Sequence, residues 1–180
     1  LSNSAKNVSQ VLSKIKKNKK TFLVGYNLLF TKSLIKLKKI IENKKDKILK
    51  VSVRSGYDLR KWRNINYEKT VSASKRKGGG VLLELSHEIN NLIWLFGKPL
   101  WVSAHISKIS NLKINTEDNV FMIIGFKDTI ANLNLDFISK NYERSMTFYY
   151  KESTLKWTYL TNSIEKLSKN SKKIRGTSFF

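Results

Sequence analysis

The sequence contains no cysteine and a single proline among its 180 residues. The absence of cysteine excludes disulfide bonds and metal sites built on thiolate ligands. It also agrees with a cytoplasmic protein, because structural disulfides are rare in that compartment. We expect no membrane partner, because apolar runs such as 121–126 are far shorter than the ~20 residues that cross a bilayer. Residues 1–10 also lack the apolar core of a signal peptide.

Acidic residues are scarce: the chain has 13 Asp and Glu against 35 Lys and Arg, which gives a net charge of +22. Such an excess raises the question of nucleic-acid binding. Most of the basic residues are lysines spread along the chain, however, whereas base and phosphate recognition favours the planar fork of arginine. The runs 16–17, 19–20 and 44–45 are most simply solvated faces. We therefore expect a basic surface rather than a nucleic-acid partner.

Helical periodicity is confined to the first part of the chain. Apolar residues spaced by three or four positions predict helices over 4–17, 31–43 and 81–96. The second of these begins at a threonine, a favourable N-cap residue. Gly97 and Pro99 end the third. With 41% hydrophobic residues, the chain has enough apolar content for one folded domain.

Alternation of apolar and polar residues dominates the later part of the chain and indicates consecutive strands joined as an antiparallel meander. Helices that come early and strands that come late predict an α+β fold: an open, mostly antiparallel sheet with helices packed on one face. Residues 163–173 are either a short helix or a frayed, Lys-rich tail. The predicted strands are 22–26, 48–55, 101–110, 119–126, 130–139, 144–150 and 155–159.

The segment 56–77 has little periodicity, and a long irregular segment in a compact domain is more often functional than idle. Trp62 and Tyr67 are candidates to stack on a sugar or nucleotide ring. Arg63 and Lys75 are candidates to bind an anionic group. The alternative is that the aromatic side chains simply anchor the loop to the core.

Three consecutive glycines, 78–80, open the segment Gly-Gly-Gly-Val-Leu-Leu-Glu-Leu-Ser-His-Glu-Ile-Asn. Glycines let the backbone approach its surroundings closely before a helix starts. Glu84 and His87 lie three residues apart and share one face of the predicted helix. A carboxylate there would orient the imidazole and hold its pKa up, as proton transfer near pH 7 requires. The alternative is a structural histidine. We interpret His105 as structural or exposed.

The glycine run with Glu84, His87 and the following Trp94-Leu95-Phe96-Gly97 resembles the signature helix of the Gfo/Idh/MocA family of oxidoreductases. The resemblance extends in order over roughly residues 1–157. The other residues that carry it are Val24-Gly25-Tyr26-Asn27 with Phe30, Tyr57-Asp58-Leu59 with Trp62-Arg63, Tyr67 and Ser72, Glu117-Asp118-Asn119, and Arg144.

This resemblance implies an N-terminal Rossmann domain that binds NAD or NADP, followed by a domain with an open sheet and the substrate pocket. Hydride then passes between the nicotinamide and a carbon of a sugar or nucleotide-sugar. By position, His87 matches the family's general acid/base and Glu84 matches its Asp. The residues expected on the substrate side are Asn27, Trp62, Arg63, Tyr67 and Lys75.

The family's Glu-Lys-Pro motif, whose lysine assists proton transfer, would lie just before Leu1. Because neither that motif nor a glycine-rich strand–turn–helix lies near the start, we interpret the chain as a catalytic half that is inactive alone. Residues 1–20 are then a helix left over from the junction with the missing nucleotide-binding domain. Residues 21–160 form the substrate and catalytic domain, and residues 161–180 form a basic tail.

Three positions depart from the family pattern. Glu84 carries one methylene more than the family's Asp, Asn90 replaces a residue that is often acidic, and Leu29 replaces an Arg. These departures predict a changed substrate or weakened activity. A second class of function also stays open: a non-enzymatic module that binds nucleic acid, or that forms homo-oligomers by pairing its open sheet with another sheet.

Overall fold

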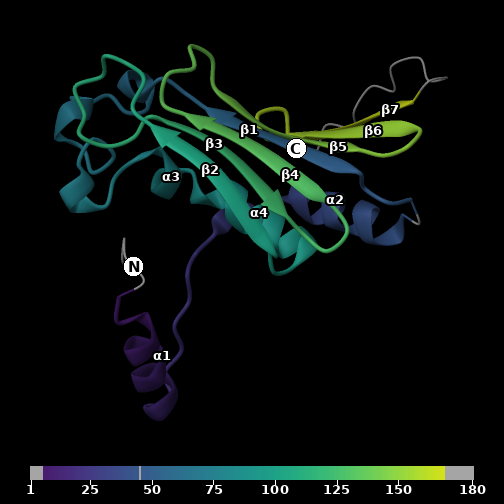
Figure 1. Cartoon of the computed structure of the whole chain (residues 1–180), viewed down its shortest axis with the longest axis horizontal. Coiled ribbons are helices and arrows are strands. Elements are labelled where there is room, and N and C mark those ends of the chain that lie inside the picture. The colour runs from purple at the N-terminus through teal and green to yellow at the C-terminus, as the bar shows by residue number, and fades with distance from the viewer. Residues whose placement is uncertain (1–5, 45, 169–180) are drawn as a thin grey trace.

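The computed structural model describes residues 6–44 and 46–168. Its helices are α1 (Val8–Lys17), α2 (Lys32–Asn43), α3 (Val81–Glu84) and α4 (Ser86–Phe96). Its strands are β1 (Lys50–Gly56), β2 (Trp101–Ser107), β3 (Asn119–Gly125), β4 (Ile130–Asp136), β5 (Glu143–Tyr149), β6 (Ser153–Thr158) and β7 (Ser163–Ser168). The strands form one sheet, and α2, α3 and α4 lie on a single side of it (Figure 1).

The strand order across the sheet is β2-β3-β4-β1-β5-β6-β7. Strand β1 pairs in parallel with β4 and antiparallel with β5, and the other neighbours are antiparallel. The predicted open, mostly antiparallel sheet is confirmed, but the uninterrupted meander is wrong because β1 lies between β4 and β5. The central place suits β1, since Val51 and Val53 are buried and neighbours on both sides satisfy its backbone groups.

The core lies between the sheet and α2 with α4. Leu34 and Leu37 of α2 and Leu92 of α4 are fully buried against inward-facing strand residues such as Phe148 and Trp157. The side of the sheet opposite the helices is therefore uncovered (Figure 1).

Among the described residues, no helix has the length and apolar character needed to cross a membrane.

Residues 6–26 stand apart from the sheet, with α1 at the far end of an extended segment (Figure 1). Helix α1 begins at Val8, slightly later than predicted, and none of its residues is buried. Its apolar residues Val8, Val11 and Leu12 stay 42%, 50% and 55% exposed. Residues 22–26 form no strand, contrary to the prediction, because no strand of the sheet runs beside them.

Two further predicted elements differ in the structure. The single helix over 81–96 is broken at Leu85, whose backbone (φ −101°, ψ 26°) leaves the helical region while its side chain is buried. The predicted helix or frayed tail over 163–173 is wrong over its first six residues, which form β7. Pairing with β6 satisfies their backbone groups and packs Ile164 against the core. The rest of that segment lies outside the described residues.

Candidate functional site

The glycine triplet and Glu117 together position the helix that carries the candidate histidine. A side chain at Gly79 would collide with the carbonyl oxygen of Val71, and one at Gly80 with the Glu117 carboxylate. Gly80 also has φ +111°, which side-chain-bearing residues rarely adopt. Glu117 accepts hydrogen bonds from the first amides of α3: Val81 N donates to its carbonyl and Leu82 N to its Oε1, both at 3.2 Å. The close approach predicted for the triplet is therefore met.

His87 is the second residue of α4, just beyond the Leu85 break, and its surroundings differ from those predicted. Glu84 does not hold the imidazole; its Oε1 accepts a hydrogen bond of 2.8 Å from Ser72 Oγ instead. The His87 ring packs edge-on against Tyr26, with centroids 5.3 Å apart. Its Nδ1 is buried and has no hydrogen-bond partner among the described residues. The break turns the two side chains apart, which the regular three-residue spacing concealed.

A cavity of about 480 Å³ opens beside His87 on the helix-covered side of the sheet. It brings together five of the predicted residues from four segments of the chain: Asn27, Trp62, Arg63, Glu84 and His87. The other lining residues are Leu28, Tyr57, Leu85, Tyr142, Arg144 and Tyr159. A hollow that combines aromatic rings with several convergent polar groups has the chemistry of a small-molecule site.

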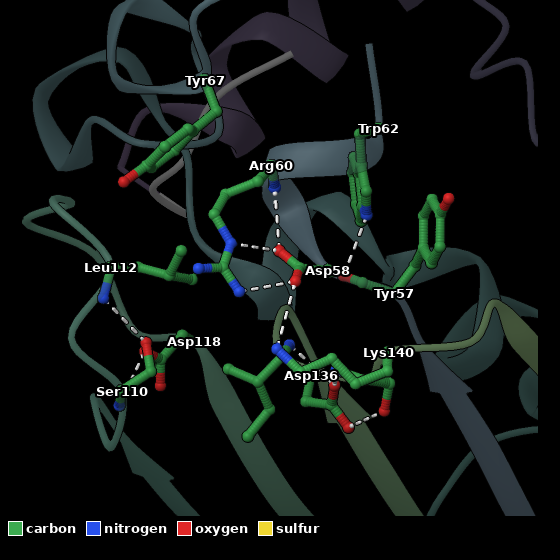
Figure 2. Close-up of polar contacts among 12 residues, drawn as sticks. Tyr57, Asp58, Arg60, Trp62, Tyr67, Ser110, Leu112, Asp118, Asp136 and Lys140 are labelled. Atoms are coloured by element: carbon green, nitrogen blue, oxygen red, sulfur yellow. Dashed lines mark hydrogen bonds and ion pairs between the residues drawn. The ribbon is translucent and has the colours of Figure 1, made fainter.

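Two predicted residues, Tyr67 and Lys75, do not line this cavity. The Tyr67 hydroxyl accepts a hydrogen bond from Lys113 N at 3.3 Å, and Figure 2 shows its ring across Arg60 from Trp62. Lys75 is exposed, and its backbone N donates to Asn115 Oδ1 at 2.8 Å. Both residues therefore make their contacts in the outer part of the loop, away from His87.

The loop that supplies Trp62 and Arg63 is fixed by a buried carboxylate. Asp58 Oδ1 accepts hydrogen bonds from Arg60 N and Nε, at 3.1 and 2.8 Å, and Lys140 approaches Oδ2 at 3.6 Å (Figure 2). The Arg60 hydrogen bonds lower the pKa of Asp58 and keep it charged. The Trp62 indole donates to the Tyr57 carbonyl at 3.0 Å. Trp62 therefore both anchors the loop and lines the cavity.

Arg144, which lines the cavity, belongs to a buried ion pair. Arg144 Nε lies 2.7 Å from Glu88 Oε1, and the two side chains are 12% and 3% exposed. Burial raises the pKa of Glu88, while the Arg144 charge opposes that shift. Arg144 stands opposite Ser55 in the β1–β5 register and is bonded through its carbonyl to Tyr159 N.

The electrostatics of this ion pair reach His87. Burial, and then the positive charge of Arg144, lower the pKa of His87 below its usual 6.5. The prediction that a neighbouring carboxylate holds this pKa up is therefore wrong, because Glu84 is engaged by Ser72 and Glu88 by Arg144. A neutral imidazole at pH 7 is a proton acceptor rather than a proton donor.

Analysis of the sequence did not select Tyr142 and Tyr159 as site residues. Tyr142 precedes β5 and Tyr159 follows β6, so antiparallel pairing brings them to the same end of the sheet, with ring centroids 6.5 Å apart. The signal in the sequence was one tyrosine just before the first strand of a hairpin and another just after the second strand. It needs the correct register to be useful.

The residues present here do not form a dinucleotide-binding turn. The amides of the glycine triplet, Gly78, Gly79 and Gly80, all donate to backbone carbonyls of the preceding loop. None of them remains to bind a phosphate, as the amides of a glycine-rich nucleotide loop do. The glycine triplet therefore shapes the start of α3 and is not a phosphate-binding turn.

Comparison with known proteins matches this sequence and this fold to one family. Residues 35–156, more than half of the chain, match the family model of the GFO/IDH/MocA C-terminal domain. No curated protein matches the sequence.

Several solved structures share the fold. Levoglucosan dehydrogenase in complex with NADH and L-sorbose has a TM-score of 0.77 at 17% identity, over 97% of this chain and 50% of that chain. An inositol dehydrogenase homolog from Azotobacter vinelandii, complexed with NAD+, has a TM-score of 0.76 at 11% identity, over 92% and 46%. The WlbA dehydrogenase from Bordetella pertussis, with NADH and UDP-GlcNAcA, has a TM-score of 0.75 at 17% identity, over 89% and 50%.

These identities are too low to show more than the fold, and the chain spans about half the length of the structures that it matches. The family match rests on the sequence of the domain itself, from α2 to β6. The chain therefore belongs to the GFO/IDH/MocA family of oxidoreductases, and the described residues form a domain of its C-terminal type.

Proposed function

We propose that this chain is the substrate-binding and proton-transferring half of an NAD(P)-dependent oxidoreductase that acts on a sugar, a sugar derivative or a nucleotide-sugar. One observation carries the proposal: His87 lines a cavity of about 480 Å³, with its pKa lowered by burial and by Arg144. The ligands named for similar structures, NADH with L-sorbose and NADH with UDP-GlcNAcA, support this class of reaction.

In this proposal, His87 accepts the proton of the substrate hydroxyl whose carbon is oxidised. A neutral imidazole is needed for that step, and a well-placed general base contributes about 100- to 10,000-fold to a rate. Glu84, fixed by its hydrogen bond from Ser72, is placed to bind a second hydroxyl. The ring of Trp62 offers an apolar face for the substrate.

The nicotinamide cofactor, whether NAD or NADP, is proposed to bind to a part of the protein other than this chain. The apolar residues of α1, together with Phe22 and Leu23 at 54% and 81% exposure, form an uncovered surface. Exposed apolar patches of this kind mark interfaces. We propose that residues 1–20 are the junction with a nucleotide-binding domain, and that the isolated chain has no oxidoreductase activity. The absence of cysteine suits the cytoplasm, the proposed location.

The test joins this chain to the sequence encoded upstream of it and follows NAD(P)H spectroscopically with sugar substrates. The joined protein is expected to bind NAD(P)H and to turn over, whereas this chain alone does neither. The His87→Ala variant is expected to lose turnover and to keep its affinity for NAD(P)H, measured by fluorescence titration. Normal turnover in that variant would remove His87 from the mechanism.

A second proposal concerns assembly: the uncovered side of the sheet pairs with the same side of a second copy. The outward positions of β2, β3 and β4 carry no Lys or Arg, although the chain has 35 of them. Two copies with a net charge of +22 repel one another elsewhere. Phe121 and Ile123 are 51% and 43% exposed there. The outward positions of β2, β3 and β4 are Trp101, Ser103, His105, Ser107, Asn119, Phe121, Ile123, Gly125, Ile130, Asn132, Asn134 and Asp136.

A further inference from the structure

Arg144 is held in place by one edge of its guanidinium group. Its contacts with Glu88 Oε1, at 2.7 Å, and with Ser55 Oγ, at 3.4 Å, both use Nε. The guanidinium carbon also lies 5.5 Å from the centre of the Tyr159 ring. Because Arg144 lines the cavity, its two terminal amino groups are left for a ligand by every contact described here.

Arg63 is the second guanidinium that lines the cavity, and it comes from the loop at the mouth. The carboxylate of that loop, Asp58, is already engaged by Arg60 and Lys140. Among the described residues, no carboxylate forms an ion pair with Arg63. Its guanidinium group is exposed and lines the cavity without a carboxylate partner among those residues.

Glu84 is the one acid among the lining residues, and Ser72 fixes its carboxylate. Among the lining residues, two guanidinium groups therefore stand against one carboxylate, and Glu88, which pairs with Arg144 Nε, does not line the cavity. A neutral sugar needs hydroxyl and amide partners, for which two arginines are not required. Guanidinium forks match the two oxygens of a carboxylate or phosphate, and such charge-assisted bonds are about twice as strong as neutral ones.

We propose that the ligand of this cavity carries an oxyanion group, a carboxylate or a phosphate, that binds Arg144 and Arg63. The inference rests on the proposed function, because it names a property of the substrate for the same cavity. The rings of Tyr57, Tyr142 and Tyr159 then contact the uncharged body of the ligand. The anionic group selects the substrate, while His87 accepts the proton.

Isothermal titration calorimetry of this chain with three probes tests the proposal. Sodium glucuronate supplies a carboxylate, uridine diphosphate supplies phosphate, and methyl glucoside is the neutral reference. At least one anion is expected to bind about tenfold more tightly than methyl glucoside, the gain typical of one charge-assisted hydrogen bond. The two anionic arms show whether the charge belongs to the sugar or to a nucleotide.

Substitutions assign the binding to the two arginines. Arg63→Gln is expected to weaken anion binding about tenfold. Arg76→Gln, an equal loss of charge at an exposed position outside the cavity, leaves it unchanged. Arg144→Gln is combined with Glu88→Gln, because a lone buried carboxylate would strongly destabilise the domain. The double variant is expected to lose the preference for anions and to keep its circular dichroism spectrum.

Three results would overturn the proposal: anions that bind no more tightly than methyl glucoside, no binding of either anion at about 20 mM, or unchanged binding in both arginine variants. None of them bears on the oxidoreductase assignment. That assignment fails on a different measurement: a joined protein that neither binds NAD(P)H nor turns over with sugar substrates.

Discussion

Two cavities of nearly equal volume, about 480 and 490 Å³, lie in different parts of this domain. The first lies on the helix-covered side of the sheet and the second on its open side. Each contains one of the two histidines: His87 lines the first and His105 the second. Arg63, Glu84 and Arg144 also line the first, whereas no charged residue lines the second.

The difference teaches that volume alone does not identify a functional site. In the first cavity, burial and a buried guanidinium shift the pKa of His87, and convergent groups with shifted pKa values mark sites of chemistry. In the second, Phe121 and Ile123 stand among asparagine and serine side chains. An uncharged, partly apolar strand face in so basic a chain fits contact with a like surface.

The largest expected effect separates the two histidines by the same substitution. In the protein joined to its cofactor-binding part, His87→Ala is expected to lower kcat by about 100- to 10,000-fold, because the proton acceptor is removed. His105→Ala is expected to leave kcat within about twofold, because His105 is exposed on β2. Steady-state kinetics measure both. Equal losses in the two variants would erase the distinction between the cavities.

The second prediction concerns the wall of the first cavity. Arg144→Gln alone is expected to lower the free energy of unfolding by about 3–5 kcal/mol, because Glu88 is left buried without its partner. The double variant Arg144→Gln/Glu88→Gln is expected to recover most of that loss.

Urea denaturation at constant m-value measures these changes. Asn132→Ala, in the second cavity, serves as the control and is expected to change stability by no more than about 0.5 kcal/mol. A single Arg144 variant as stable as this control would show that the buried pair contributes nothing to the domain.

The part of the site that follows from the sequence is the part encoded locally. The glycine triplet, Glu84 and His87 stand within ten positions, so their spacing indicates one helix start before any tertiary contact is known. The Leu85 break was not predictable from that spacing, and neither was the contact of Glu117, which reaches the start of α3 from a segment before β3. The pKa of His87 was mispredicted because it is lowered by burial in the tertiary fold and then by Arg144 on a distant strand.

The part of the fold that could be predicted from the sequence is also local: the alternation of apolar and polar residues within each strand. Their order requires long-range pairing: β1 is inserted between β4 and β5 through hydrogen bonds that local patterns do not encode. Strand β7 was not predicted because its Ser, Lys and Glu residues obscure the apolar alternation, and it forms a strand by pairing with β6. Tyr142 and Tyr159 became site residues through the same long-range register.

The third prediction concerns the second cavity. Ile123→Lys is expected to convert a dimer of this chain into a monomer, because it places a positive charge in a contact between two positive chains. The cost is about 2 kcal/mol or more of association free energy.

Size-exclusion chromatography with light scattering measures the mass of each variant. The control is Ile35→Lys on α2, where Ile35 has similar exposure, 39% against 43%. A monomeric unsubstituted chain, or equal effects of the two lysines, would contradict assembly through the open side.

The smallest expected effect is on the pH dependence of the joined protein. Because burial and Arg144 lower the pKa of His87, the acid limb of kcat/KM is expected below pH 6.5, the model value for a histidine. In the Arg144→Gln/Glu88→Gln variant this limb is expected to move up by less than about one pH unit, because burial, the larger cause, remains. The same lowered pKa affects stability. The unfolded chain binds the His87 proton more readily than the folded chain does. The contribution of neutral His87 to the free energy of unfolding is therefore complete above pH 6.5 and is lost as the pH falls toward the folded pKa. A limb above pH 6.5 in the unsubstituted protein would mean that a carboxylate, rather than Arg144, governs the imidazole.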